Sequence, residues 1–376
     1  MAGAMTMRAD HILICFHDFN RGGTERIALG MARRWIDQGR RVTILCGARV
    51  GGLEDTVDPR IEVVELDPPL PRSLTSRLRL GPAMAPYVER LKPDVIFLPG
   101  NFHFPLIPAL AKVRGAAALV AKISNPAVPK GIVAGPVRWL LRRFARNLDG
   151  FAAMNTGLEA EIRAIAPWVN VSTLYDPVFL ADNPAPHRPT GDRLEILWAG
   201  RFEPQKDAPL ALKTIAALNR IAPARLTMLG EGYLRPRMER MAARMGLGDK
   251  VRFMGHVPAI DPFLAEADAL FVSSTFEGGP AVAVEALAHG VPVVSTDCSH
   301  FLRDIMAIPE AGMIVPCRKP DPLAHGLLTV ARTPRPSPAL LRPLIAHLAA
   351  EPCADAYLAW FDRVVHDRNS AMGGTA

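Results

Sequence analysis

The chain has 376 residues, of which 49% are hydrophobic and 22% charged, and its formal net charge is +7. One hydrophobic core rarely extends beyond about 250–300 residues, so this length predicts two domains, and the composition excludes a disordered chain. The basic residues are scattered and accompany no zinc-finger, homeodomain or RNA-recognition motif, so we expect phosphate-bearing or anionic membrane partners and no nucleic acid.

The cysteines and the apolar segments narrow the class of protein further. The five cysteines are widely spaced and form no Cys-x-x-Cys pair, which argues against a disulfide framework and against a zinc site. The apolar segment His11–Phe16 is too short for the hydrophobic region of a signal peptide. No apolar run reaches about 18 residues, the length that spans a bilayer. These features predict a cytoplasmic protein without a transmembrane helix.

Strands and helices alternate along the first half of the chain. A buried strand is predicted at His11–Phe16, then a turn at Gly22–Gly23, a helix from Thr24 to Gln38 and a second strand at Val42–Cys46. Such a strand–helix–strand unit requires a parallel sheet. Further strands are predicted at 61–66, 94–98, 119–123 and 150–154, and further helices at 82–90, 106–112 and 137–146.

A proline-rich linker at Asp176–Asp192 separates this half from a second alternating set. Its strands are predicted at 194–199, 225–229, 251–253, 269–273, 291–295 and 311–315, and its helices at 208–221, 235–245, 258–265 and 280–289. Residues 334–343 are predicted to be irregular, and 354–365 to form an amphipathic helix. The expected fold is α/β, with two Rossmann-like domains facing a cleft. We expect an N-terminal domain at 1–180, a C-terminal domain at 190–350, and a last helix within 351–376 that packs back toward the N-terminal domain.

The strongest local motif runs from Phe276 to Thr296. A buried strand leads into Glu277 and a glycine pair, Pro280 suits the first position of a helix, and Gly290 suits its end. Backbone N–H groups at the start of such a helix bind anions. On spacing alone, a plain strand–turn–helix in which Glu277 interacts with the helix dipole is an equal alternative.

A second motif places cations after the first strand of the second domain. Gly200 ends the strand, and Arg201 and Lys206 flank the following turn. At the carboxyl end of a parallel strand, these two cations could hold a diphosphate, although a solvated surface turn is the favoured interpretation of this segment in isolation. Two further glycine turns, Gly22–Gly23 and Gly230–Glu231–Gly232, are weaker signals of the same kind.

Together these turns resemble the retaining glycosyltransferases of the GT-B fold, family 4, also called glycosyl transferases group 1. The resemblance covers nearly the whole chain and is strongest from Ile196 to Val315. It implies that Arg201 and Lys206 hold the donor diphosphate and stabilise the leaving group, and that Glu277 contacts the transferred sugar. These three are the expected catalytic residues.

The resemblance also implies a donor site and the substrates. Glu285 would bond the ribose hydroxyls of the nucleotide. The other implied donor-binding residues are small residues of the four turns: Gly22, Gly23, Gly200, Gly230, Gly232, Gly278, Gly279, Pro280 and Ala281. The donor would be a UDP- or GDP-sugar of hexose type, and the acceptor a glycan or a lipid-linked saccharide. Because the chain contains no Asp-x-Asp motif, we expect no metal ion and no other cofactor.

The sequence departs from the family pattern at one important point. Many members carry a histidine after the strand that matches Leu119–Ile123, where this chain has Ser124 and Asn125. Either residue could supply a polar contact to the sugar or acceptor, or the contact could be missing. His103 is a possible substitute, or a polar loop residue.

A basic, apolar stretch at Arg138–Arg146 is predicted either to lie on anionic lipid at the inner face of a membrane or to pack its apolar stripe on the sheet. Two rival functions are a sugar-nucleotide epimerase of the same fold and a non-catalytic homologue. A nicotinamide dehydrogenase is a poor fit because neither domain opens with Gly-x-Gly-x-x-Gly.

Overall fold

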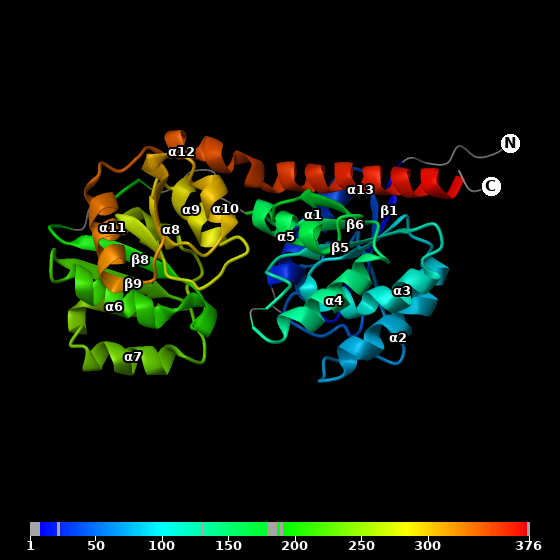
Figure 1. Ribbon diagram of the computed structural model, residues 1–376, viewed down its shortest axis with the longest axis horizontal. Coiled ribbons are helices and arrows are strands. Elements are labelled where there is room, and N and C mark those ends of the chain that lie inside the picture. Colours follow the sequence, from blue (N-terminus) through cyan, green and yellow to red (C-terminus); the bar gives the residue numbers. More distant parts are fainter. Residues whose placement is uncertain (1–7, 21–22, 130, 179–185, 189–190, 374–376) are drawn as a thin grey trace. The chain divides into compact units, whose positions relative to one another are not determined.

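The computed structural model describes residues 8–20, 23–129, 131–178, 186–188 and 191–373. The chain divides into two compact units, unit 1 with residues 1–177 and 350–376, and unit 2 with residues 178–349. Each unit consists of one parallel sheet with helices on both faces (Figure 1).

Unit 1 contains a seven-stranded sheet in the order β3-β2-β1-β4-β5-β6-β7, in which every neighbouring pair is parallel. Its strands are β1 (His11–Phe16), β2 (Arg41–Cys46), β3 (Glu62–Glu65), β4 (Val95–Leu98), β5 (Ala118–Ile123), β6 (Gly150–Ala153) and β7 (Asn170–Thr173). Its helices are α1 (Gly23–Asp37), α2 (Ser76–Leu91), α3 (Ile107–Val113), α4 (Ala134–Ala145), α5 (Thr156–Ile165) and α13 (Ala350–Gly373). Two short 3-10 helices complete it, η1 (Glu54–Thr56) and η2 (Asn101–Leu106).

The central strands of the unit 1 sheet, such as β1 and β4, are buried on both faces, which explains why they are largely apolar, whereas the edge strands β3 and β7 are more polar and partly exposed. Alternate residues of β1 enter different cores: Leu13 packs in the core beneath α2 to α5, and Ile14 packs in the core beneath α1 and α13. Because a parallel sheet needs helical crossovers on its faces, the alternating sequence pattern leads directly to this layered arrangement.

The C-terminal helix α13 completes the second of these cores. Tyr357, Trp360 and Phe361 are fully buried, and the Phe361 ring lies 5.2 Å from the ring of Trp35 in α1, centroid to centroid. The Trp35 Nε1 donates to the Ala354 carbonyl at 3.2 Å. Residues from opposite ends of the chain therefore form one core, and Figure 1 shows α13 lying beside α1.

Unit 2 contains a six-stranded parallel sheet in the order β10-β9-β8-β11-β12-β13. Its strands are β8 (Leu194–Ala199), β9 (Ala224–Leu229), β10 (Val251–Gly255), β11 (Ala269–Val272), β12 (Val293–Thr296) and β13 (Gly312–Val315). Its helices are α6 (Ala208–Leu218), α7 (Arg235–Arg244), α8 (Asp261–Glu266), α9 (Ala281–Ala288), α10 (His300–Ile305), α11 (Pro320–Arg332) and α12 (Pro338–Ile345). Its 3-10 helices are η3 (Pro204–Lys206), η4 (Gly248–Lys250), η5 (Pro309–Ala311) and η6 (Ala346–Leu348).

Two predictions of local structure were wrong, both at prolines. Residues 334–343 are not irregular throughout, because α12 begins at Pro338, where the Ser337 side chain accepts a hydrogen bond from Leu340 N and caps the helix. Helix α2 begins before Pro82, because the Ser73 and Ser76 hydroxyls each accept a bond from the other residue's backbone N–H.

Candidate functional site

Three glycines bring the carboxyl ends of β8 and β9 together at one edge of the unit 2 sheet. Gly200 N donates to Leu229 O at 3.0 Å, and a Cβ on Gly230 would lie only 2.1 Å from Gly200 O. Gly230 and Gly232 also have φ angles of +120° and +153°, which side chains rarely permit. Gly230 and Gly232 are therefore required by backbone contact, at the sheet edge where α/β folds bind ligands.

Lys206 and Glu277 form an ion pair at this edge. Lys206 Nζ lies 2.6 Å from Glu277 Oε1, and their side chains are 19% and 7% exposed. The aliphatic part of the Lys206 side chain passes over Gly200. A Cβ added to Gly200 would lie 3.1 Å from Lys206 Cδ. Two motifs that the sequence separates by 71 positions thus meet in one site.

The Glu277 carboxylate accepts two further hydrogen bonds. Ser274 Oγ donates to Oε1 at 2.5 Å, and Gln205 Nε2 lies 3.4 Å from Oε2. Its backbone N donates to Cys298 O at 2.9 Å. The carboxylate is therefore fixed in place as an acceptor.

Helix α9 begins beside Glu277, one residue later than predicted. Pro280 occupies the position before the helix, Ala281 is its first residue, and Ala283 N donates to Pro280 O at 2.9 Å. Gly278 is buried, and its carbonyl accepts from Ser299 Oγ at 3.2 Å. The start of α9 and the ion pair thus lie at the same sheet edge, and Glu285, partly buried, follows within the helix.

The two predicted diphosphate cations have different surroundings. The Arg201 side chain is 69% exposed and forms a salt bridge with Glu203 at 2.8 Å, whereas Lys206 is mostly buried with Glu277. An exposed arginine pair contributes little to stability. Arg201 is therefore available to an anionic ligand at little cost to the fold.

Unit 1 carries a second polar cluster, at the carboxyl end of β1. Asp18 is fully buried and accepts from Arg72 Nε at 2.8 Å and Nη2 at 3.0 Å, and Arg72 Nη2 lies 3.9 Å from the Glu25 carboxylate. Burial works to raise the pKa of Asp18, but the hydrogen bonds from Arg72 and Asn20 and the charge of Arg72 together lower that pKa below its ordinary value. Of the predicted Gly22–Gly23 turn, Gly22 lies outside the described residues, and Gly23 is the exposed first residue of α1.

The three candidates for the replaced histidine are in different situations. His103 is buried, its Nδ1 lies 3.3 Å from Gly100 O, and desolvation lowers its pKa to about 4. Asn101 fixes the loop after β5, because its side chain accepts a hydrogen bond from Ser124 N and donates one to Asn125 O, both at 3.0 Å. Ser124 Oγ is buried and has no hydrogen-bond partner in the described part of the chain.

A family model described as Glycosyl transferases group 1 matches residues 193–333, and one described as Glycosyl transferase 4-like domain matches residues 22–175. The chain belongs to the group 1 glycosyl transferases. It is 31% identical over 165 residues to the lipopolysaccharide core biosynthesis glycosyltransferase LpsE of Rhizobium meliloti, a match that covers 42% of this chain and 46% of LpsE. It is 25% identical over 337 residues to a phosphatidyl-myo-inositol mannosyltransferase of Mycolicibacterium smegmatis, covering 85% of this chain and 83% of that protein.

The fold of this glycosyl transferase family member is that of GT-B enzymes. A crystal structure of a TarM mutant from S. aureus, in complex with fondaparinux, α-GlcNAc-glycerol and UDP, superposes with a TM-score of 0.77 at 12% identity. The superposition covers 94% of this chain and 99% of TarM. The chain matches less than half of the length of the first curated relatives, from 34% to 46%.

Several residues of both sites were not anticipated from the sequence. In unit 1 these are Asp18 and Arg72, and in unit 2 Ser274, which bonds Glu277. Asp18 and Ser274 each lie two residues beyond the end of an apolar strand, and this position was the available signal, because side chains there line the carboxyl edge of a parallel sheet.

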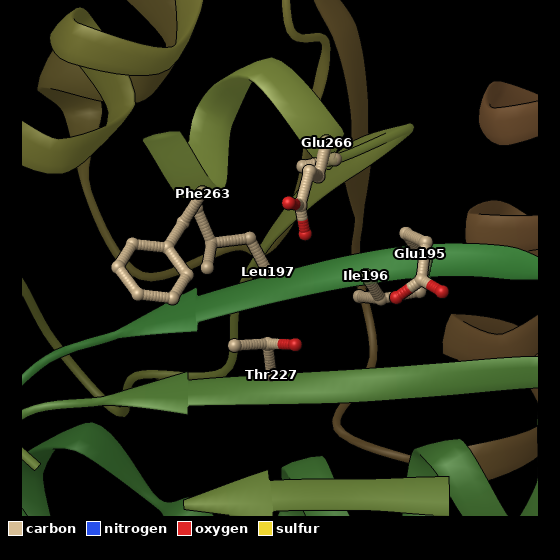
Figure 2. Close-up of a pocket in the computed structure, with 7 residues that line it drawn as sticks. Glu195, Ile196, Leu197, Thr227, Phe263 and Glu266 are labelled. Atoms are coloured by element: carbon tan, nitrogen blue, oxygen red, sulfur yellow. The ribbon is translucent and has the colours of Figure 1, made fainter. Parts of the chain in front are cut away.

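Two hollows in unit 2 lie away from these residues. Figure 2 shows the smaller, where Phe263 and Glu266 of α8 lie over Leu197 and Thr227 of neighbouring strands. At about 10 Å³ it has room for one water molecule and not for a sugar nucleotide. The larger, about 300 Å³, includes Pro292 and lies at the amino ends of β12 and β13, the edge opposite to the glycine turns. Neither coincides with a predicted site residue.

Proposed function

We propose that this protein is a retaining glycosyltransferase that moves a hexose-type sugar from a UDP or GDP donor to a glycan or lipid-linked acceptor without a metal ion. The observation that carries the proposal is the Lys206–Glu277 pair beside the start of α9, at the carboxyl edge of the unit 2 sheet. This arrangement offers a cation, a carboxylate and helix-start amides to one ligand. Membership of the group 1 glycosyl transferases supports a sugar donor as that ligand.

The leaving group explains why cations would be needed. When the bond from the sugar to the diphosphate breaks, negative charge develops on the nucleotide diphosphate. Lys206, Arg201 and the backbone N–H groups of Gly278, Gly279 and Ala281 would stabilise that charge, and fixed groups of this kind lower a barrier without reorganising. These groups can perform the task that a metal ion performs in enzymes with an Asp-x-Asp motif.

Glu277 would then be released from Lys206 to meet the sugar. In the structure the two groups neutralise each other, so a donor diphosphate would compete with Glu277 for Lys206. A carboxylate that keeps its bond from Ser274 can accept from sugar hydroxyls. Glu285, within α9, would bond the ribose. Retention would follow from attack on the same face, with the leaving phosphate accepting the acceptor proton.

The relatives point to sugar acceptors on lipids and polysaccharides. LpsE is named for lipopolysaccharide core biosynthesis and the M. smegmatis relative for phosphatidyl-myo-inositol, and the TarM complex contains UDP. We infer an acceptor of the same broad chemical class for this chain.

A membrane contact through α4 would suit such an acceptor. Leu141 is buried toward the sheet, whereas Trp139 is 65% exposed and Leu140 is also exposed. Arg142 lies 5.0 Å from the ring centroid of Trp168, which is itself exposed. Basic residues with exposed aromatic rings favour an anionic bilayer surface. In the described residues, no helix has both the length and the apolar character to cross a membrane.

The proposal is tested by incubating the purified protein with UDP-glucose, UDP-galactose, UDP-N-acetylglucosamine and GDP-mannose in EDTA. Thermal stabilisation by one donor, with slow release of its nucleoside diphosphate, is expected. NMR of the sugar transferred to a trial acceptor would then report the anomeric configuration. Conversion of the donor to another nucleotide sugar would instead show an epimerase, and the absence of binding would favour a non-catalytic homologue or a donor outside these four.

A further inference from the structure

Arg318 makes three contacts in unit 2 that link separate parts of the candidate site. It lies in the loop between β13 and α11, and its side chain is partly exposed. Its guanidinium donates to the Asp207 carboxylate, to Ser274 O and to Ser273 O, the last at 3.2 Å. A planar guanidinium with five donors can serve three acceptors at once, which an ammonium group does less well.

The first acceptor fixes the backbone next to Lys206. Asp207 directly follows Lys206 and has a φ of +44°, a left-handed conformation that costs free energy in a residue with a side chain. Its Oδ1 also accepts from Leu210 N at 3.2 Å, which caps α6. Arg318 bonds the other oxygen, Oδ2, so it helps to hold the turn that orients Lys206.

The other two acceptors fix the carboxyl end of β11. Ser274 donates its hydroxyl to Glu277, while its carbonyl accepts from Arg318 and, at 2.7 Å, from Thr296 Oγ1. The hydroxyl of Ser273 donates to Lys206 O at 2.7 Å. Arg318 therefore forms direct hydrogen bonds with both segments of the chain that carry the ion pair, the one next to Lys206 and the one that leads to Glu277.

We propose that Arg318 is a positioning residue for sugar transfer, which holds Lys206 and Glu277 in the relative geometry that the transition state needs. This inference rests on the proposed function, which assigns those two residues to the donor. It concerns a residue that touches neither of their charged groups. Displacing a reacting group by about 1 Å can cost about 100-fold in rate, so a common anchor for both segments has a direct kinetic consequence.

The test compares Arg318→Ala and Arg318→Lys with the wild type in the release of nucleoside diphosphate from the four donors named above. We expect Arg318→Ala to lower kcat at least about tenfold and to change the donor KM less than about threefold, since the transition state depends more on alignment than donor binding does. The kcat of Arg318→Lys, which keeps the positive charge, should lie between that of the wild type and that of Arg318→Ala. The matched control is Arg220→Ala, which removes an exposed arginine paired with Asp321 in the same unit and should leave kcat unchanged.

A double-mutant cycle distinguishes positioning from a general loss of stability. Because Arg318 and Ser274 are proposed to act on the same carboxylate, Arg318→Ala should cost much less in a Ser274→Ala background than in the wild type. The inference would be overturned if the two single substitutions lowered kcat by factors that multiply fully in the double variant, or if Arg318→Ala had a wild-type kcat. If Arg318→Ala does not fold, Arg318→Lys carries the test, and a wild-type kcat in that variant overturns it. A wild type that releases no nucleoside diphosphate would refute the proposed function itself, whereas an active wild type with an unimpaired Arg318→Ala refutes only this inference.

Discussion

Lys206 and Glu277 neutralise each other at a site where both are predicted to bind a substrate. The pair joins the turn after β8 to the turn after β11, and it is largely shielded from water. A buried charge left without its partner destabilises a protein, so each member of the pair stabilises the other within the fold. A donor diphosphate can replace the Glu277 carboxylate as the anionic partner of Lys206.

Replacing Lys206 tests this exchange. Lys206→Met should lower kcat by at least about 100-fold, because a fixed cation facing the leaving group is lost. Loss of the cation that pairs with the buried Glu277 carboxylate should lower the melting temperature, but the fold should persist because Ser274 and Gln205 still bond that carboxylate. Arg201→Ala should also lower turnover strongly, with almost no change in melting temperature because its side chain is exposed. Steady-state release of nucleoside diphosphate, beside thermal melts, measures both. Wild-type rates in either variant would remove that residue from the diphosphate site.

The glycine turn makes a prediction about stability. Gly230→Ala should lower the free energy of unfolding by at least about 2 kcal/mol, because the new Cβ would overlap Gly200 O and the φ of +120° is strained. Gly246→Ala is the control, since Gly246 has a φ of +65° but open space around its Cβ position. The control should lose only about 1–2 kcal/mol, the cost of a left-handed residue. Urea denaturation measures both, and equal losses would show that backbone contact does not decide the position.

The glycine turns and most of the strands were predictable, because apolar runs and glycines mark them locally, whereas the short polar strand β7 was not predicted. Parallel strands bring their carboxyl ends to one edge of a sheet, so the sequence alone predicts that Lys206 and Glu277 lie at the same edge. Their direct pairing could not, because it depends on side-chain geometry. The roles assigned to Lys206, Glu277, Arg201 and Glu285 stay predictions.

The remaining polar contacts join residues too distant for any local pattern. Asp18 and Arg72 are 54 positions apart, and Asp207 and Arg318 are 111 apart. Each pair forms only once the sheet order is set. The error at Pro338 has a different cause: prolines mark the first turn of a helix as well as irregular segments, and the Ser337 cap decides between them.

His103 gives unit 1 a specific pH dependence. Burial lowers its pKa from an ordinary value of 6.5 to about 4, so between these pH values the unfolded chain binds more protons than the folded one. Stability should therefore be complete above pH 6.5 and fall as the pH is lowered toward 4. Between pH 6.5 and 5 the wild type should lose about 1.5 kcal/mol more than His103→Gln, because the slope approaches about 1.4 kcal/mol per pH unit only below pH 6.5.

Denaturation curves at these two pH values measure the difference. His366→Gln, at an exposed histidine of α13, is the control and should follow the wild type. Parallel losses in the wild type and His103→Gln would mean that His103 is not held neutral by burial.

Helix α4 makes the prediction about membranes. Trp139→Ser should reduce cosedimentation with vesicles that contain anionic phosphatidylglycerol by at least about threefold, because an exposed aromatic ring at the interface is lost. Ile221→Ser, at an exposed apolar residue of unit 2, should bind as the wild type does. Vesicles of phosphatidylcholine alone should bind less of the wild type and less of Ile221→Ser than the anionic vesicles do. Equal binding to charged and neutral vesicles would refute the electrostatic contact.

The most direct test of the central claim is the release of nucleoside diphosphate from the four donors in EDTA, by the wild type and by Lys206→Met in parallel. The proposed function predicts that the wild type uses one donor without added metal, and that Lys206→Met is folded but at least about 100-fold slower. A wild type that neither binds nor cleaves any donor, or a Lys206→Met variant as fast as the wild type, would contradict it.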